Sequence, residues 1–82
     1  MPTVLTLAGL RVVIYPNDHR PAHVHLIGSD AHAVFIMNCP DGPAQLRESF
    51  GFAKPALTRL ARTLDEHRAE LCAAWRRIHG DF

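Results

Sequence analysis

The chain has 82 residues, 48% of them hydrophobic and 21% charged, and a formal net charge of +1 with neutral histidines. This length suits one domain with one modest core, residues 1–82, and excludes a separate cofactor-binding domain. This small net charge excludes the strongly basic surface of nonspecific nucleic-acid binders. Any contact with RNA would therefore have to use a local patch.

The first residues contain no basic segment followed by an apolar stretch, so the sequence shows no signal peptide. No apolar run approaches the roughly 18 residues that a membrane-spanning helix needs. The two cysteines, Cys39 and Cys72, lack CxxC spacing. We therefore expect a cytoplasmic protein without membrane contact, whose cysteines are reduced and structural. A disulfide between them is the alternative.

The first half of the chain is typical of β-structure. β-branched and apolar residues predict four strands, at 3–7, 10–15, 23–27 and 32–37. Ala8-Gly9 is expected to form a tight hairpin turn between the first two strands. The Pro-Asn-Asp segment at 16–18 ends the second strand, because proline lacks a ladder donor and Asn and Asp favour turns. Since the connections are too short for parallel crossovers, the predicted sheet is a four-stranded antiparallel meander.

The second half of the chain is predicted to be helical after a loop. Segment 38–52 is rich in proline and glycine and is interpreted as this loop, with a short ordered stretch near 45–48. The helical part covers about 54–79, and Pro55 suits its first turn. A stripe in steps of three and four, apolar except for Arg68, then follows and marks one buried helix face: Leu57, Ala61, Leu64, Arg68, Leu71, Trp75 and Ile78.

The helical part can form one long helix or two shorter ones. One helix over 55–79 would be roughly 37 Å long at 1.5 Å per residue, beyond the roughly 26 Å diameter of so small a domain. Thr63 and Glu66 fit a capping box. We therefore favour two helices that break near 63–66, with a single helix projecting toward a partner as the alternative. The predicted fold class is α+β, with the helices packed on the sheet.

The most distinctive motif is the segment Asn17–His25, which holds three of the six histidines. The pKa of histidine lies near neutrality, so such a cluster indicates proton transfer, metal ligation or phosphate contact. Side chains alternate along a strand, so His23 and His25 point to one side while Val24 and Leu26 point to the other. Because the apolar pair faces the core, the two imidazoles are expected to face solvent or a partner.

Residues outside this strand extend the histidine patch. His32 joins this patch across the hairpin in only one register. A two-residue loop places His32 opposite His25 and so within the patch, whereas a three-residue loop places it opposite Leu26, on the other face. His19 lies in the preceding loop. The residues expected to contact a substrate are Arg20, Asn17 and Tyr15.

Three interpretations of the patch remain open from the residues alone. In the first, His19, His23 and His25 ligate zinc or nickel, and Asp18 completes a tetrahedral set. In the second, His23 and His25 are the base and acid of a metal-independent ribonuclease, while His19 or Arg20 holds phosphate. In the third, the histidines are partly exposed polar residues of a sheet edge or a protein interface.

The opening Met-Pro-Thr-Val, the Asn-Asp-His-x-Pro-x-His-Val-His segment and the terminal Trp-x-x-x-His-Gly resemble a small bacterial family. It is catalogued as domain of unknown function 4160, and the resemblance covers nearly the whole chain. The family motif falls on Asn17, Asp18, His19, Pro21, His23 and His25. Members often carry a lysine where this chain has Ala33-Val34-Phe35, which weakens the ribonuclease interpretation.

The resemblance implies the toxin-like component of a bacterial type II toxin–antitoxin pair. Such a protein would be cytoplasmic, would bind a cognate small antitoxin-like protein, and would act on RNA or translation. If it is an enzyme, we expect a ribonuclease that works without a cofactor. The alternatives are a noncatalytic protein-interaction module, as a homodimer or hetero-oligomer, and a small histidine-based metal-binding protein.

Overall fold

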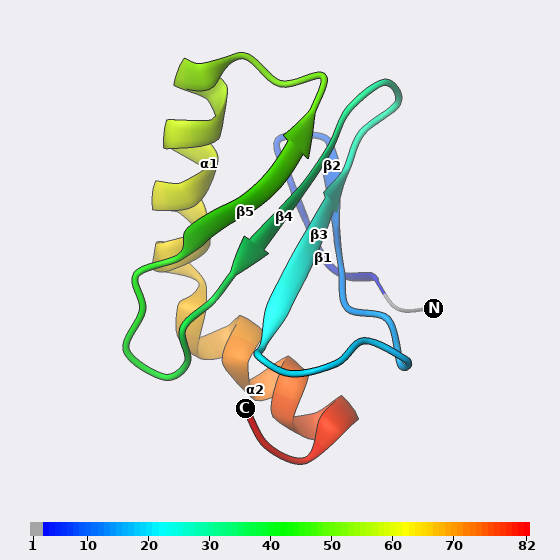
Figure 1. Ribbon diagram of the computed structural model, residues 1–82, viewed down its shortest axis with the longest axis vertical. Helices are drawn as coiled ribbons and strands as arrows, with labels where there is room; N and C mark the ends of the chain where they lie inside the picture. Colours follow the sequence, from blue (N-terminus) through cyan, green and yellow to red (C-terminus); the bar gives the residue numbers. More distant parts are fainter. Residues whose placement is uncertain (1–2) are drawn as a thin grey trace.

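The computed structural model describes residues 3–82 and contains an antiparallel sheet followed by two helices (Figure 1). Met1 and Pro2, from the Met-Pro-Thr-Val motif, lie outside the described residues. The strands pair in chain order, which confirms the α+β class and the meander. The elements are β1 (Thr3–Leu7), β2 (Leu10–Val13), β3 (His23–Ile27), β4 (His32–Ile36), β5 (Gln45–Phe50), α1 (Lys54–Glu66) and α2 (Arg68–His79).

The sheet has five strands, so the prediction of four is wrong. The missed strand is β5, which pairs antiparallel with β4 inside the segment interpreted as a loop. Every residue of β5 is exposed. An edge strand of this kind buries little apolar surface, so its sequence lacks the apolar alternation that marks the inner strands.

The first hairpin turn forms as predicted. Ala8 and Gly9 have φ angles of 50° and 79°, the positive values that a two-residue hairpin turn with the right-handed strand twist requires. Strand β2 stops at Val13, earlier than predicted, because the next residues form a turn. In this turn the Asp18 N–H donates to the Tyr15 carbonyl oxygen, 3.0 Å away.

Two helices are present, as favoured, but the predicted capping box is wrong. Thr63 lies inside α1, and its hydroxyl donates to the Arg59 carbonyl oxygen one turn earlier, at 3.0 Å. The helices separate at His67, whose φ and ψ are −106° and 14°. Pro55 occupies the first turn of α1, as predicted. Among residues 3–82, no helix has the length and apolar character needed to cross a membrane.

The core lies between one face of the sheet and both helices. Figure 1 shows α1 beside β5 and α2 across the lower end of the sheet. Strand residues Val12, Val24, Leu26, Ala33 and Phe35 pack against the helix residues Leu60, Leu64, Leu71 and Trp75. Most of the predicted helical stripe is buried or half-buried, whereas Ile78 is 39% exposed.

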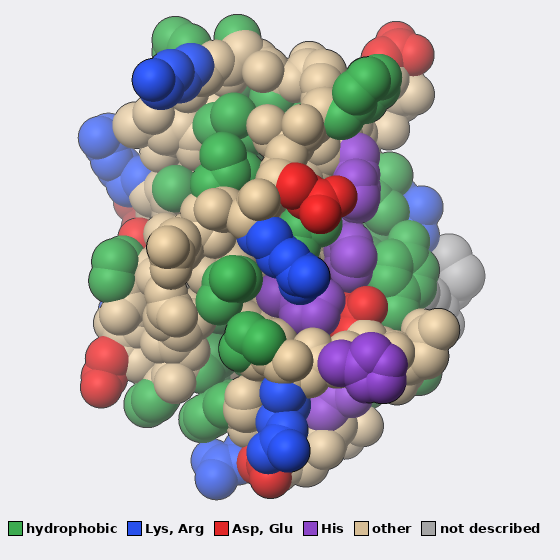
Figure 2. Space-filling view, in the orientation of Figure 1, with side chains coloured by type: hydrophobic (Ala, Val, Ile, Leu, Met, Phe, Trp, Pro, Cys, Tyr) green, Lys and Arg blue, Asp and Glu red, His purple; other side chains and the backbone are tan. Residues whose placement is uncertain are grey.

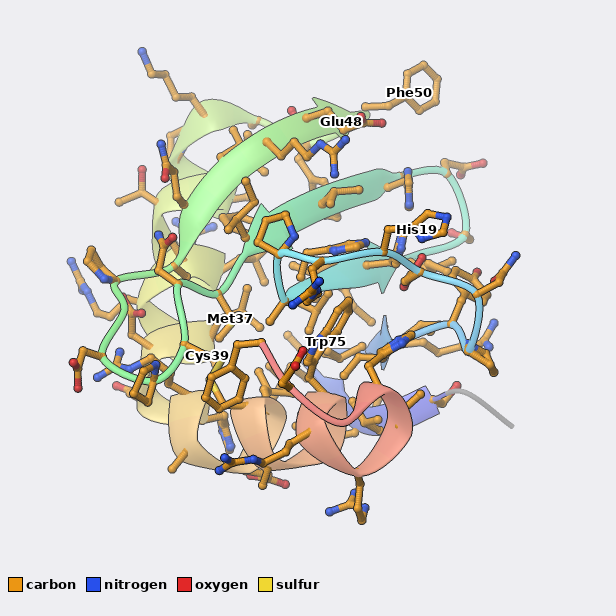
Figure 3. The ribbon with its side chains drawn as sticks, turned by 60° about the horizontal axis from the view of Figure 1, so that its bottom comes forward. His19, Met37, Cys39, Glu48, Phe50 and Trp75 are labelled. Atoms are coloured by element: carbon orange, nitrogen blue, oxygen red, sulfur yellow. A yellow bond between two sulfur atoms is a disulfide. The ribbon has the colours of Figure 1, made fainter. Side chains whose placement is uncertain are left out.

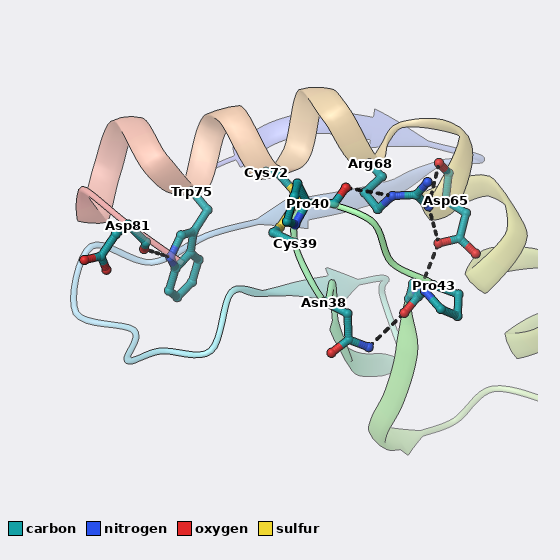
Figure 4. Close-up of a disulfide and its surroundings, with 10 residues drawn as sticks. Asn38, Cys39, Pro40, Pro43, Asp65, Arg68, Cys72, Trp75 and Asp81 are labelled. Atoms are coloured by element: carbon teal, nitrogen blue, oxygen red, sulfur yellow. Dashed lines mark hydrogen bonds and ion pairs between the residues drawn. A yellow bond between two sulfur atoms is a disulfide. The ribbon is translucent and has the colours of Figure 1, made fainter.

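The two cysteines form a disulfide, so the expectation of reduced cysteines is wrong. Cys39 follows β4 and Cys72 lies in α2, with their Cα atoms 5.8 Å apart. Figure 4 shows the surrounding contacts, in which Arg68 Nε donates to the Pro40 carbonyl oxygen at 3.2 Å. The loop after β4 therefore lies directly on α2. Only this tertiary contact brings together two cysteines that are 33 positions apart.

Candidate metal centre

Asp18, His23 and His25 meet on the side of β3 that faces away from Val24 and Leu26, beside the C-terminal part of α2, and we call them the Asp–His cluster. The histidines alternate along β3, and Asp18 comes from the loop before it. One potential ligand atom from each residue lies within 4.8 Å of the others. Figure 2 shows histidine side chains running down this face, with Lys or Arg side chains beside them.

The cluster is more buried than the sequence indicated. The exposed side-chain fractions are 13% for Asp18, 7% for His23 and 16% for His25. The predicted alternation of faces holds, since Val24 and Leu26 belong to the core on the helix side. We expected both rings to face solvent or a partner, but His23 is buried, because Trp75 of α2 packs 5.2 Å from its ring.

A local turn directs the Asp18 carboxylate toward β3. The backbone N–H of Tyr15 donates to Asp18 Oδ2 at 2.9 Å. The backbone N–H of Asp18 donates to the Tyr15 carbonyl oxygen at 3.0 Å. This reciprocal pairing is typical of the turns that Asp residues form with nearby backbone. The carboxylate is thus held in place before any ligand binds.

His25 lies between this carboxylate and a third histidine. Its Nε2 atom is 3.3 Å from Asp18 Oδ1 and 3.2 Å from Asp18 Oδ2, and its Nδ1 atom is 3.4 Å from His32 Nε2. Burial lowers the pKa of His25 below its ordinary value of 6.5, and the neighbouring Asp18 opposes this shift only in part. His25 is therefore neutral at pH 7, the form in which imidazole ligates a metal or accepts a proton.

The orientation of the His23 ring is fixed by a hydrogen bond at Nδ1, the nitrogen that faces away from Asp18. Its Nδ1 atom is 2.8 Å from the Pro21 carbonyl oxygen, which can only accept, so Nδ1 carries the hydrogen. In the neutral ring, Nε2 is then an acceptor. This acceptor lies 3.6 Å from Asp18 Oδ1, which is itself an acceptor. These two atoms are therefore placed so that a shared cation, either a proton or a metal ion, can bind between them.

Two distances within the cluster are close to those of a metal centre. Ligand atoms about 2.05 Å from a tetrahedral zinc ion lie roughly 3.4 Å from one another. Asp18 Oδ1 lies 3.3 Å from His25 Nε2 and 3.6 Å from His23 Nε2, and the three ligand atoms all lie within 4.8 Å of one another. Each Nδ1 atom has a partner outside the cluster, as metal-ligating histidines almost always do. The set of two imidazoles and one carboxylate fits a divalent transition metal with a coordination position left for water or substrate.

The structure brings some predicted site residues into the cluster and leaves others beside it. Asp18, rather than His19, joins the two strand histidines. Tyr15 packs edge-on against His25, with ring centroids 4.9 Å apart. Asn17, His19 and Arg20 line an adjacent pocket of about 330 Å³.

His32 reaches the cluster in a register that neither sequence alternative included. It pairs with Ile27, while His25 pairs with Val34, so residues 28–31 form the connection. His32 still shares a face with His25, and the two rings stack with centroids 5.6 Å apart. Both predicted registers are wrong because the turn is longer than either of them assumed.

Three residues that support the site were not among the predicted site residues. Trp75, interpreted as core, is 1% exposed and also backs His23. Figure 3 shows Trp75 between α2 and the strands. His79 Nε2 donates to the Tyr15 carbonyl oxygen at 3.2 Å, and its signal in the sequence was its place in the terminal Trp-x-x-x-His-Gly motif. Arg47 lines the adjacent pocket from β5, and nothing pointed to it because that strand was missed.

Comparison with known proteins places the chain in a family but assigns no activity. No curated protein and no solved structure matches it. The family model described as "Domain of unknown function (DUF4160)" matches residues 9–76, which is well over half of the chain and includes the whole Asp–His cluster. The chain therefore belongs to the DUF4160 family.

Proposed function

We propose that this protein binds a divalent transition-metal ion through Asp18, His23 and His25, and that this ion is the centre of its activity. The observation that carries the proposal is the approach of two acceptors, His23 Nε2 and Asp18 Oδ1, to 3.6 Å. The other ring nitrogen of His23, Nδ1, donates to the Pro21 carbonyl oxygen. A metal ion between these two atoms would coordinate both of them.

The ligand set favours zinc, with nickel and iron as related ions. Imidazole suits all three metals, and two histidines with one carboxylate are typical of sites that keep a position open. When bound in such a site, the ion activates water or polarises a substrate oxygen. The residues of this chain then hold the ion, orient the rings and exclude bulk water through Tyr15 and Trp75.

Zinc content after dialysis tests this proposal. We expect the untagged protein to retain about one zinc ion per chain, and Asp18→Asn, His23→Asn and His25→Asn each to lose it. His19→Asn is the matched control, because His19 lies in the same motif but outside the cluster. Retention of zinc by the His23→Asn variant, or no retention by the wild type, would refute the proposal.

A second candidate uses the same residues without a metal. The lowered pKa of His25 leaves its ring neutral at pH 7, and Asp18 lies within hydrogen-bond distance, as in the base–carboxylate pair of many acid–base sites. This pair supports acid–base chemistry. The ribonuclease activity, and the role as the cytoplasmic, toxin-like member of a toxin–antitoxin pair with a small antitoxin-like partner, rest on the family resemblance alone.

Expression in a bacterial host tests this second candidate. Growth arrest that the neighbouring gene relieves, and that His25→Ala abolishes, would support it. RNA cleavage by the purified protein that persists in a chelator would favour this candidate over the metal centre. Expression without any effect on growth would argue against the toxin.

A further inference from the structure

We infer that the pocket beside the Asp–His cluster binds an anion of the phosphate class, held by Arg47 and Arg20. The inference rests on the proposed metal site, because the bound anion would lie next to the ion. The substrate class would then be a phosphate group of a nucleotide or phosphodiester, and Arg47 of β5 would be one of the residues that bind it.

The pocket is continuous with the cluster. It has a volume of about 330 Å³, and Asp18 and His23 belong to its lining. His19, Arg20 and Arg47 also line it. This volume lies at the small end of ligand pockets, so it suits a phosphate group with a modest substituent rather than a large ligand.

A β-bulge accounts for the presence of Arg47 in this lining. Val34 pairs with Glu48 and Phe35 pairs with Leu46, so Arg47 is the extra residue between two adjacent pairs. Bulges redirect a side chain and occur preferentially at sheet edges near functional sites. Leu46 packs toward the helices in an apolar pocket with Leu57, whereas Arg47 lines the pocket that contains His23.

The two arginines differ in their existing partners. Arg47 takes part in none of the ion pairs found among residues 3–82. Arg20 is 3.3 Å from Asp81, and both side chains are about 70% exposed, so this ion pair is weak and can exchange for an anion. Planar guanidinium groups bind phosphate oxygens in a bidentate manner, which favours phosphate over a monovalent spherical anion.

Metal and anion binding should be coupled. Without a metal, the Asp18 carboxylate faces the pocket and repels an anion. With a divalent ion bound, the cluster has a net positive charge, because the ion outweighs one carboxylate. The same anion should therefore bind more tightly to the zinc-loaded protein, and by linkage it should tighten zinc binding by the same factor.

Calorimetric titration with inorganic phosphate tests the inference on zinc-loaded and metal-free protein. We expect binding to the zinc-loaded wild type and a weakening of about tenfold or more in Arg47→Ala, the loss of a charge-assisted contact. Arg47→Lys should weaken binding less. Arg77→Ala, on the exposed surface of α2, is the matched control and should bind phosphate as the wild type does.

Zinc content measured on each variant separates failure of the anion site from failure of the metal site. Equal phosphate binding by wild type and Arg47→Ala, at unchanged zinc content, would overturn the anion site alone. If the wild type retains no zinc, the metal proposal fails, and the same titration on metal-free protein still decides whether Arg47 holds phosphate. Binding of acetate as tightly as phosphate would contradict the assigned ligand class.

Discussion

Strands β3 and β5 belong to one sheet but differ in burial and in strand pairing. Strand β3 is paired on both sides and carries the two cluster histidines, of which His23 is buried and His25 half-buried. Strand β5 is an exposed edge with a bulge, and Figure 3 shows Phe50 projecting at its end. The two histidines of the proposed metal site therefore come from the doubly paired centre of the sheet, whereas Arg47 of the proposed anion site comes from its exposed edge.

The sharpest test of this difference is a pair of leucine truncations. Leu26 in β3 is 0% exposed and Leu46 in β5 is 42% exposed. We expect Leu26→Ala to lower the free energy of unfolding by about 3–5 kcal/mol through lost burial and a cavity. Leu46→Ala should cost about 1 kcal/mol or less. Urea denaturation measures both, and equal losses would contradict the contrast between centre and edge.

The disulfide provides the next largest effect, because it anchors the connection that leads to β5. A double Cys39→Ala, Cys72→Ala variant should lose about 3–4 kcal/mol of stability, the chain-entropy value for a loop of this length. The loop spans 33 positions. Denaturation of the wild type with and without reductant provides the same comparison without mutation. A reduced protein as stable as the oxidised one would show that the bridge does not constrain this loop.

The pH dependence of stability probes β3 when the wild type is compared with a His25 variant. The pKa of His25 is lower in the folded state than its ordinary value of 6.5, so the unfolded chain binds more protons between these two values. Stability of the metal-free protein should therefore be fully present above about pH 6.5 and fall as the pH drops through the folded pKa. His25→Asn should show a flatter profile. An increase in wild-type stability relative to this variant on acidification would reverse the predicted sign.

The smallest effect on stability is expected in β5. Arg47→Ala removes an exposed side chain outside the ion pairs found among residues 3–82, so the free energy of unfolding should change by about 0.5 kcal/mol or less. Thermal and urea unfolding measure this change. A large loss would indicate that Arg47 stabilises the fold rather than binding an anion.

Local patterns were sufficient to predict much of the fold. Strand β3 was predicted with its observed bounds, because apolar and polar residues alternate over 23–27. The turn at Ala8-Gly9 and the helix start at Pro55 were also correct. Strand β5 was missed because its exposed residues make no alternating pattern. The capping box failed because Thr63 bonds within its own helix.

For the site, strand periodicity was enough to predict that His23 and His25 share a face, the one opposite Val24 and Leu26. Long-range packing and the path of the loop before β3 bring Asp18 rather than His19 to them, place Trp75 over His23, and join Cys39 to Cys72. Periodicity is a property of neighbouring residues, whereas these contacts join segments that are distant in the chain or depend on the exact path of a loop. The burial that lowers the pKa of His25 follows from that packing.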